Sequence, residues 1–203
     1  VAAVRGALIE VDGLMGSARI GSRIAIQCED GLVDAEVTGL DRETAHCLSF
    51  NDPHGIATGA RADLLQRQSV LRPTDQWLGR VVDGLGRPID NKGPLSLGPV
   101  SRPFKADPPA AADRTRVGRR LETGVRALDM FAPLCRGQRL GLFAGSGVGK
   151  STLLSMLARW VETDVAVIGL IGERGREVQE FIEDDLGPEG LARSVVVVAT
   201  SDS

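Results

Sequence analysis

One stretch of the sequence carries the residues needed to bind phosphate. Residues 144–151 read Ala-Gly-Ser-Gly-Val-Gly-Lys-Ser, so Ala144 stands where this P-loop spacing usually has its first glycine. The glycines let the backbone bend tightly, and its N–H groups can then point at phosphate oxygens. Lys150 would neutralise the terminal phosphates, and the Ser151 hydroxyl would be a ligand of Mg²⁺. The alternative interpretation is a glycine-rich turn that only caps a helix.

A nucleotide in this loop would touch most of its residues. The residues that we predict to bind the nucleotide in this segment are Ala144, Gly145, Ser146, Gly147, Val148, Gly149, Lys150, Ser151 and Thr152.

A second candidate group is Gly172-Glu173-Arg174, which directly follows the apolar run 165–171. The loop at 144–151 also follows an apolar run, 140–144. In an open α/β sheet, ligands bind beyond the carboxyl ends of the strands, so both groups are expected at the same edge. Glu173 would there orient the water that attacks the γ-phosphate. The alternative for this triplet is a helix start with exposed charges.

The elements around these two groups follow an α/β pattern. Apolar runs at 140–144, 165–171 and 195–200 predict strands. Helices are predicted between them at 150–160, with Leu153, Leu154, Leu157 and Trp160 on one apolar face, and at 175–186, ended by Gly187 and Pro188. Continuous apolar strands that alternate with helices indicate a parallel sheet covered on both faces.

The first part of the chain has a different pattern. Short, partly alternating runs at 7–11, Arg23–Cys28, 32–39 and 46–50 predict strands, and residues 55–64 are expected to hold a loop and then a further short strand. The tetrapeptide Glu29-Asp-Gly-Leu32 between two runs predicts a tight hairpin. This pattern is typical of a small β-barrel or sandwich.

These patterns divide the chain into three parts. We expect a β-barrel domain at 1–74, an ordered linker or start of the next domain at 75–113, and a P-loop domain at 114–203 that is incomplete at its C-terminal side. Pro73 marks the first boundary, and prolines at 103, 108 and 109 exclude a regular helix in the second part. Because the chain begins at Val1, we expect it to be a piece of a longer protein.

Composition narrows the functional classes. The chain has 203 residues, 42% of them hydrophobic and 25% charged, and a net charge of -3, as in soluble globular proteins. Tyrosine is absent, with only two Trp and five Phe, which argues against a base-stacking surface and a nucleic-acid partner. Cys28, Cys47 and Cys135 are predicted to be free buried thiols in a reducing compartment.

The other charged groups are predicted to be non-catalytic. His46 and His54 have no partners at metal-ligand spacing and are interpreted as structural or surface residues. One acidic cluster is expected to form a solvated helix face; it consists of Glu180, Glu183, Asp184 and Asp185. One basic cluster is expected to form a solvated or inter-subunit face; it consists of Arg114, Arg116, Arg119 and Arg120.

The two motifs resemble one known family. Residues 136–151 and 168–178 resemble the flagellum-specific export ATPases, relatives of the injectisome ATPases and of the catalytic subunit of rotary F-type ATP synthases. The segments 81–88 (Val-Val-Asp-Gly-Leu-Gly-Arg-Pro), 123–129, 183–187 and 195–201 are also similar to that family. The resemblance is specific over 78–203 and loose in the barrel region.

This resemblance implies a fold and a set of roles. It implies a β-barrel followed by a RecA-like ATPase domain, with ATP and Mg²⁺ as ligands. By this resemblance, Lys150 and Glu173 take catalytic roles. Ser151 would support Mg²⁺ directly and Glu177 would support it through a water. Arg174 would contact the γ-phosphate. It further implies a cytoplasmic homohexamer at the base of the flagellum that works with export apparatus proteins, chaperones, export substrates and a membrane-embedded export gate.

The chain departs from the family in where it stops. The strand with the Mg²⁺-supporting Asp, the aromatic residue that packs on adenine, the arginine finger and the C-terminal domain would all follow Ser203. We therefore expect strand 195–200 to lack a neighbour. We also expect the 203-residue chain alone not to turn over ATP, since an arginine finger is worth about 10³–10⁵ in rate.

Four functions remain as hypotheses. The leading one is ATP hydrolysis that energises flagellar type III protein export, and an injectisome ATPase is the nearest alternative. A non-catalytic nucleotide-binding subunit of a rotary ATPase would have an uncharged residue in place of Glu173. A hexameric RNA helicase would need a basic, aromatic-rich barrel, whereas Phe50 is the only aromatic residue before Trp77.

Overall fold

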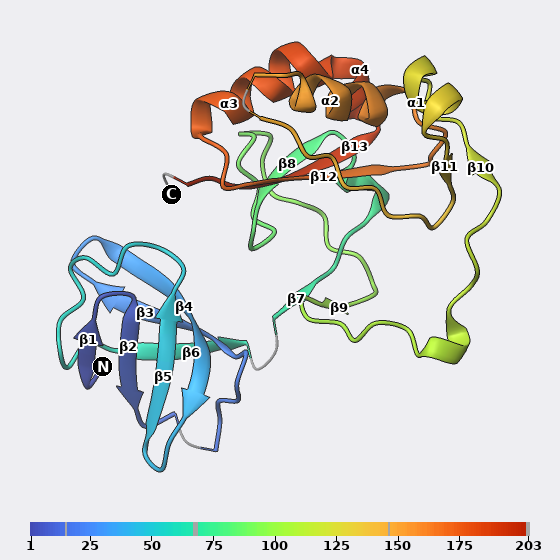
Figure 1. Ribbon diagram of the computed structural model, residues 1–203. Helices are drawn as coiled ribbons and strands as arrows, with labels where there is room; N and C mark the ends of the chain where they lie inside the picture. The colour runs from blue at the N-terminus through green and yellow to red at the C-terminus, as the bar shows by residue number, and fades with distance from the viewer. Residues whose placement is uncertain (15, 67–68, 146, 202–203) are drawn as a thin grey trace. The chain divides into compact units, whose positions relative to one another are not determined.

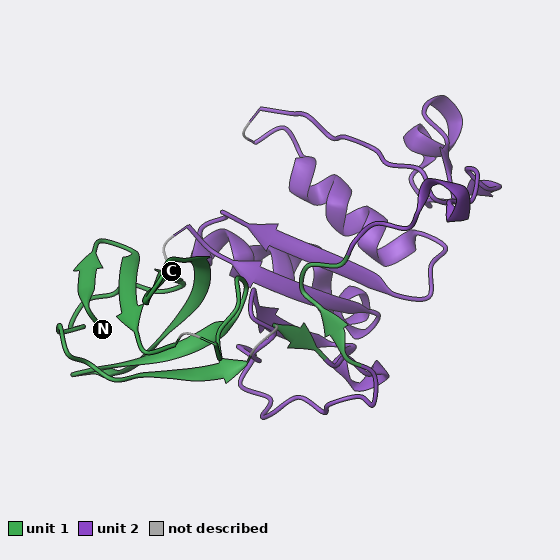
Figure 2. Ribbon diagram, turned by 90° about the horizontal axis from the view of Figure 1, so that it is seen from below, with its two compact units in different colours: residues 1–71, 101–106 green, residues 72–100, 107–203 purple. Residues whose placement is uncertain are grey.

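The chain forms two compact units. The computed structural model describes residues 1–14, 16–66, 69–145 and 147–201. Unit 1 comprises residues 1–71 and 101–106, and unit 2 comprises residues 72–100 and 107–203 (Figure 2). The short segment 101–106 belongs to unit 1 because β9 (Arg102–Pro103) pairs with β7 (Val70–Leu71) in an antiparallel ladder.

Unit 1 is a small antiparallel β-barrel (Figure 1). Its six-stranded sheet has the order β1-β2-β5-β4-β3-β6. The strands are β1 (Ala3–Arg5), β2 (Leu8–Asp12), β3 (Arg23–Cys28), β4 (Gly31–Leu40), β5 (Thr44–Ser49) and β6 (Ala62–Gln66).

Backbone hydrogen bonds bring the two ends of this sheet together. The amino group of Val1 donates to the Ala60 carbonyl at 2.7 Å, and the Gly59 N–H donates to the Val1 carbonyl at 2.8 Å. Alternate side chains of the strands point inward, and Ile9, Ile24 and Ile26 are fully buried there. The sheet therefore closes around an aliphatic core.

The strand predictions for this unit are largely confirmed. The bounds of β3 are those expected, and β2, β4 and β5 differ from the predicted runs by one or two residues. The tight hairpin is also confirmed, since Cys28 and Gly31 are opposite each other at the turn. Strand β1 was not predicted, because three residues are too few to show an alternating pattern.

Unit 2 contains a three-stranded parallel sheet with the order β12-β13-β8. Its strands are β8 (Arg80–Asp83), β12 (Ala166–Ile171) and β13 (Ser194–Ala199). The helices are α1 (Arg126–Phe131), α2 (Lys150–Trp160), α3 (Gly175–Glu180), the π-helix η3 (Phe181–Leu186) and α4 (Gly187–Ala192). Two short 3-10 helices, η1 (Asp75–Trp77) and η2 (Ala111–Asp113), and the antiparallel pair β10 (Arg120–Leu121) and β11 (Leu134–Cys135) complete the unit.

The prediction that strand 195–200 lacks a neighbour is wrong. β13 is the central strand and pairs in parallel with β12 on one side and β8 on the other. The partner β8 lies in the segment 75–113, which was expected to be an ordered linker or the start of the next domain. A pairing across more than one hundred residues leaves no local signal, so the two valines of β8 could not be recognised as a strand from their surroundings.

The strand predicted at 140–144 does not form. This segment has no strand structure, and Leu140 and Phe143 are 43% and 97% exposed. An apolar run becomes a strand only where its N–H and C=O groups pair with a neighbour. Neither β12 nor β8 uses its second edge to pair with this segment in the described residues.

The helix predictions are correct in position and partly wrong in detail. α2 has the expected bounds, but its buried residues are Ser155 and Ala158, whereas Leu154 and Trp160 of the predicted apolar face are 39% and 50% exposed. The small residues allow close packing of α2 against η3 and α4. The helix expected at 175–186 changes at Phe181 from α to π geometry and ends at Gly187, which has the positive φ (64°) expected of a cap.

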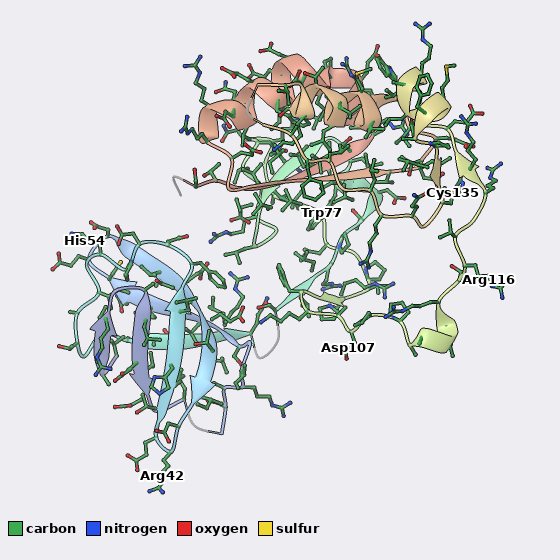
Figure 3. All side chains as sticks on the ribbon, in the orientation of Figure 1. Arg42, His54, Trp77, Asp107, Arg116 and Cys135 are labelled. Atoms are coloured by element: carbon green, nitrogen blue, oxygen red, sulfur yellow. The ribbon has the colours of Figure 1, made fainter. Side chains whose placement is uncertain are left out.

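Side-chain burial settles several smaller predictions. Only Cys47 is a buried thiol, while Cys28 and Cys135 are half-buried, so the expectation of three buried thiols is wrong for two of them. The basic cluster is exposed as predicted; Figure 3 shows Arg116 extending away from the chain. Within the described residues, no helix has the length and apolar character needed to cross a membrane.

An ion pair fastens the loop after β8 to the sheet. Arg80 donates to both carboxylate oxygens of Asp90, at 2.7 and 2.9 Å, and the two side chains are 12% and 5% exposed. Asp90 also accepts hydrogen bonds from the Val81 and Lys92 N–H groups. The Arg80 guanidinium, with help from these N–H groups, holds the pKa of Asp90 well below its ordinary value.

We expect Asp90→Asn to destabilise unit 2. The loss of a charged acceptor should lower the free energy of unfolding at pH 7 by about 1–2 kcal/mol after allowance for solvent screening. Because the folded-state pKa of Asp90 is lowered, its stabilisation is present above the unfolded-state pKa of about 4 and is lost as pH falls below it. Urea unfolding at pH 7 and pH 3 would measure this; an equal difference between variant and wild type at both pH values would contradict it.

Candidate functional site

The glycine-rich segment forms a bend at the start of α2. Gly147 and Gly149 have φ angles of 76° and 97°, in the left-handed region that side chains disfavour. The helix begins directly afterwards at Lys150 and runs for 11 residues, so its free N–H groups and the positive end of its dipole face the bend. The sequence thus produces an anion-binding geometry by local conformational preference alone.

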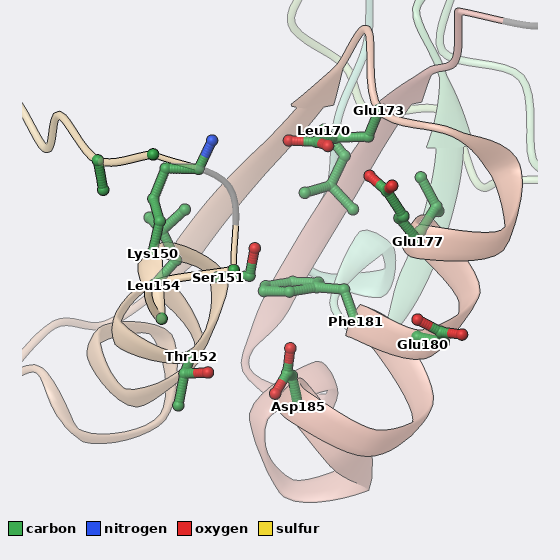
Figure 4. Close-up of a pocket in the computed structure, with 15 residues that line it drawn as sticks. Lys150, Ser151, Thr152, Leu154, Leu170, Glu173, Glu177, Glu180, Phe181 and Asp185 are labelled. Atoms are coloured by element: carbon green, nitrogen blue, oxygen red, sulfur yellow. The ribbon is translucent and has the colours of Figure 1, made fainter.

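A cavity of about 550 Å³ lies between this bend and the segment that follows β12 (Figure 4). In Figure 4 the Lys150 amine and the Glu173 carboxylate extend toward the same space from opposite sides, and the Ser151 hydroxyl lies below them. The cavity is lined by Ala144, Gly145, Gly147, Gly149, Lys150, Ser151, Thr152, Leu154, Leu170, Glu173, Glu177, Val178, Glu180, Phe181 and Asp185.

The position of Glu173 is fixed by backbone hydrogen bonds to the end of β13. The Gly172 N–H donates to the Ala199 carbonyl at 2.7 Å, and the Ser201 N–H donates to the Glu173 carbonyl at 3.1 Å. Gly172 has a φ of 75°, which turns the chain away from the direction of the strand. The half-buried Glu173 side chain is thereby directed toward the cavity.

Glu177 and Arg174 lie on opposite sides of the cavity boundary. Glu177, in the first turn of α3, lines the cavity, and its carboxylate is half-exposed. Arg174 forms an ion pair with Glu177 at 3.9 Å, but its side chain is 80% exposed and is not part of the lining. In this structure Arg174 therefore pairs with Glu177 and does not reach the space between Lys150 and Glu173.

Most of the residues predicted from the sequence meet at this cavity. Of the nucleotide-binding segment, seven described residues line it: Ala144, Gly145, Gly147, Gly149, Lys150, Ser151 and Thr152. Val148 is 68% exposed and does not line it, because the bend directs that side chain outward. The prediction for Ser146 lies outside the described residues.

A second group of residues, not predicted from the sequence, also lines the cavity. Glu180 and Asp185, which we expected on a solvated helix face, line the cavity, while Glu183 and Asp184 are exposed as expected. Phe181 also lines it from the same segment. Glu180 and Phe181 follow Glu177 at i+3 and i+4 and so lie on the same face of the helix. Helical spacing from Glu177 could therefore have identified them as lining residues.

The far end of α2 is held by two contacts. The Arg193 guanidinium donates to the carbonyl of Arg159, in the last turn of the helix, and to those of Val161 and Thr163 just after it, at 2.9, 2.9 and 2.5 Å. Gly124 packs so closely on Trp160 that an added Cβ would lie 2.6 Å from the Trp160 Cβ. These contacts fix the helix whose other end carries Lys150 and Ser151.

The oxygen donors at the cavity suit Mg²⁺ only in the company of phosphate. Hydroxyl and carboxylate oxygens of Ser151 and Glu177 are ligand types that Mg²⁺ prefers. Across the described ranges, His, Cys, Asp and Glu side chains form no group of three that could hold a metal ion by themselves. Mg²⁺ is commonly bound by a few protein oxygens together with waters and substrate phosphates. Ser151 and Glu177 therefore fit a Mg²⁺ ion that is bound together with a phosphate ligand.

Comparisons with known proteins point in the same direction. The family model "ATP synthase alpha/beta family, nucleotide-binding domain" matches residues 124–203. The curated flagellum-specific ATP synthase of Caulobacter vibrioides is 52% identical over 203 residues, covering 100% of this chain and 46% of that protein. The corresponding protein of Treponema pallidum is 45% identical, again over 100% of this chain and 45% of that protein.

A solved structure is similar over the same extent. The assembled ATPase EscN in complex with its central stalk EscO, from the type III secretion system of enteropathogenic E. coli, matches with a TM-score of 0.86 and 37% identity. The match covers 99% of this chain and 48% of that chain. The chain spans about half the length of the relatives that it matches.

Matches of this extent include the barrel, the bend before α2 and the Glu173 loop together. The chain is similar over its whole length to the flagellum-specific ATP synthases, and its residues 124–203 match the nucleotide-binding domain of the ATP synthase alpha/beta family.

Proposed function

We propose that the full-length protein hydrolyses ATP to energise flagellar type III protein export. The observation that carries this proposal is the meeting of two segments at one cavity: the anion-binding bend with Lys150 and Ser151, and the loop after β12 with Glu173. Identities of 45–52% to flagellum-specific ATP synthases, against 37% to EscN, favour the flagellar system over an injectisome.

The residues at the cavity supply the parts that phosphoryl transfer needs. The backbone N–H groups of the bend and the Lys150 amine bind the β- and γ-phosphates and stabilise the charge that develops on their oxygens. Glu173 accepts a hydrogen bond from a water and orients it for in-line attack on the γ-phosphorus. Thr152 and the other loop residues that line the cavity would complete the phosphate contacts, and Arg174 would need to rotate from Glu177 to reach the γ-phosphate.

Magnesium fits at the Ser151 side of the cavity. Ser151 would hold it directly, and Glu177 would hold it through a water. When bound, the ion neutralises charge on the β- and γ-phosphate oxygens.

A non-catalytic nucleotide-binding subunit is the second candidate. Such a subunit would bind ATP with the same bend and have no use for a carboxylate at the γ-phosphate. The Glu173 side chain directed into the cavity favours catalysis over this alternative.

We further propose that the protein acts as a homohexamer with nucleotide between subunits, in the cytoplasm at the base of the flagellum. EscN, with which this chain shares its fold, is described as an assembled ATPase with a central stalk. By analogy, a stalk protein, export apparatus proteins, chaperones and export substrates are the expected partners, together with the membrane-embedded export gate.

The first test addresses nucleotide binding. In the full-length protein, Lys150→Met should weaken ATP binding about 10- to 100-fold, the usual cost of losing a charged hydrogen bond to phosphate. Arg176→Met is the matched control, since it removes the same charge from a residue that pairs with Glu180 and does not line the cavity. Titration with a fluorescent ATP analogue measures both; equal weakening by the two substitutions would contradict the site.

The second test addresses turnover. Glu173→Gln should leave the Kd for ATP within about threefold and lower kcat by about 10²–10⁴, because the amide no longer orients the attacking water. Glu183→Gln, an exposed acid of η3 outside the lining, should keep kcat. Phosphate-release kinetics report the result, and turnover retained by Glu173→Gln would refute its assignment.

The third test addresses the metal. Glu177→Gln should raise the Mg²⁺ concentration needed for half-maximal turnover about 10- to 100-fold, as loss of an indirect metal partner does. ATP binding measured in EDTA should not change. If the Mg²⁺ requirement stays that of the wild type, Glu177 has no role in holding the ion.

A further inference from the structure

The floor of the cavity is built from the hydrophobic core of unit 2. Three core residues also line the cavity: Leu170 of β12, Val178 of α3 and Phe181 at the start of η3. Phe181 is the largest of them and is only 4% exposed. The hydrophobic core and the cavity therefore share side chains, so the packing of the core sets the dimensions of the cavity.

The Phe181 ring extends from η3 toward α2 (Figure 4). In that view Ser151 lies beside the ring on the α2 side, and Glu177 lies above it on the α3 side. The elements α2 and η3 pack on each other, so a side chain between them determines how closely they approach. In this view the Phe181 ring therefore lies between the α2 side and the α3 side of the site.

The backbone changes geometry at the same residue. The helix is α up to Glu180 and π from Phe181 to Leu186. A wider π turn brings residues five apart closer to one face, and Phe181 and Leu186 are both buried in the same cluster. Such π turns occur frequently at functional sites, because they direct a side chain that an α-helix would place elsewhere.

We propose that Phe181 is a positioning residue that fixes the separation between Ser151 on α2 and the carboxylates of Glu173 and Glu177. This inference rests on the proposed ATP hydrolysis. Nucleotide binding depends on the bend and Lys150, which are placed by α2 itself. Hydrolysis additionally requires the acids to lie at the correct distance from the bound phosphate, and misplacement by about 1 Å can cost on the order of 100-fold in rate.

The test compares two truncations of buried side chains in the same helix. In the full-length protein, Phe181→Ala should lower kcat about 10- to 100-fold and leave the Kd for an ATP analogue within about threefold. Leu186→Ala is the matched control: it is fully buried in the same cluster and segment but does not line the cavity. It should lower Tm by a similar amount and keep kcat within about threefold of wild type at a temperature where both variants are folded.

If the Phe181→Ala variant does not fold, the Phe181→Leu variant provides a second test. It fills most of the core volume but lacks the far edge of the ring, so kcat should fall about threefold to tenfold with no change in the Kd for nucleotide. The proposal is overturned if a folded Phe181→Leu variant has the kcat of wild type, or if Phe181→Ala and Leu186→Ala lose kcat equally. Retained turnover in Glu173→Gln would refute the proposed function instead, which separates the two failures.

Discussion

Backbone pairing of β13 with both of its parallel neighbours is the interaction on which the site depends. It fixes β12, the strand that leads to Glu173, and two further hydrogen bonds join the Glu173 loop to the end of β13. Through β8 it joins a segment from before the P-loop to one that follows it. Glu173, the proposed catalytic acid, is therefore positioned by long-range main-chain pairing, whereas the bend proposed to bind phosphate is formed by local glycine geometry.

This difference explains what the sequence could predict. The bend, the bounds of α2 and the cap at Gly187 all follow from residue types within one turn of the position concerned, and they were predicted correctly. The strand expected at 140–144 and the isolated state expected for β13 were wrong, because apolar composition does not reveal which strand, if any, will pair. Glu180 could have been placed at the cavity by its helical spacing from Glu177, whereas Asp185 could not, because the change from α to π geometry at Phe181 leaves no clear trace in the sequence.

The charge balance of the cavity also restricts how it can bind a polyanion. Its lining carries one cationic side chain, Lys150, and four acidic ones, of which Glu177 and Glu180 are paired with arginines outside the cavity. A triphosphate facing Glu173 and Asp185 would be repelled unless other groups compensated. The backbone N–H groups of the bend and the end of the α2 dipole supply part of that compensation, and a divalent cation would supply the rest.

In the proposed function, binding and hydrolysis of ATP depend on different parts of the fold. The groups proposed to bind phosphate lie on one continuous segment, so they would keep their mutual geometry even if the rest of the cavity shifted. The acids follow β12 or lie on the helices after it, and their distance from a bound phosphate would be set through the packed interior. A change in that packing would therefore alter the proposed rate of hydrolysis without releasing the nucleotide.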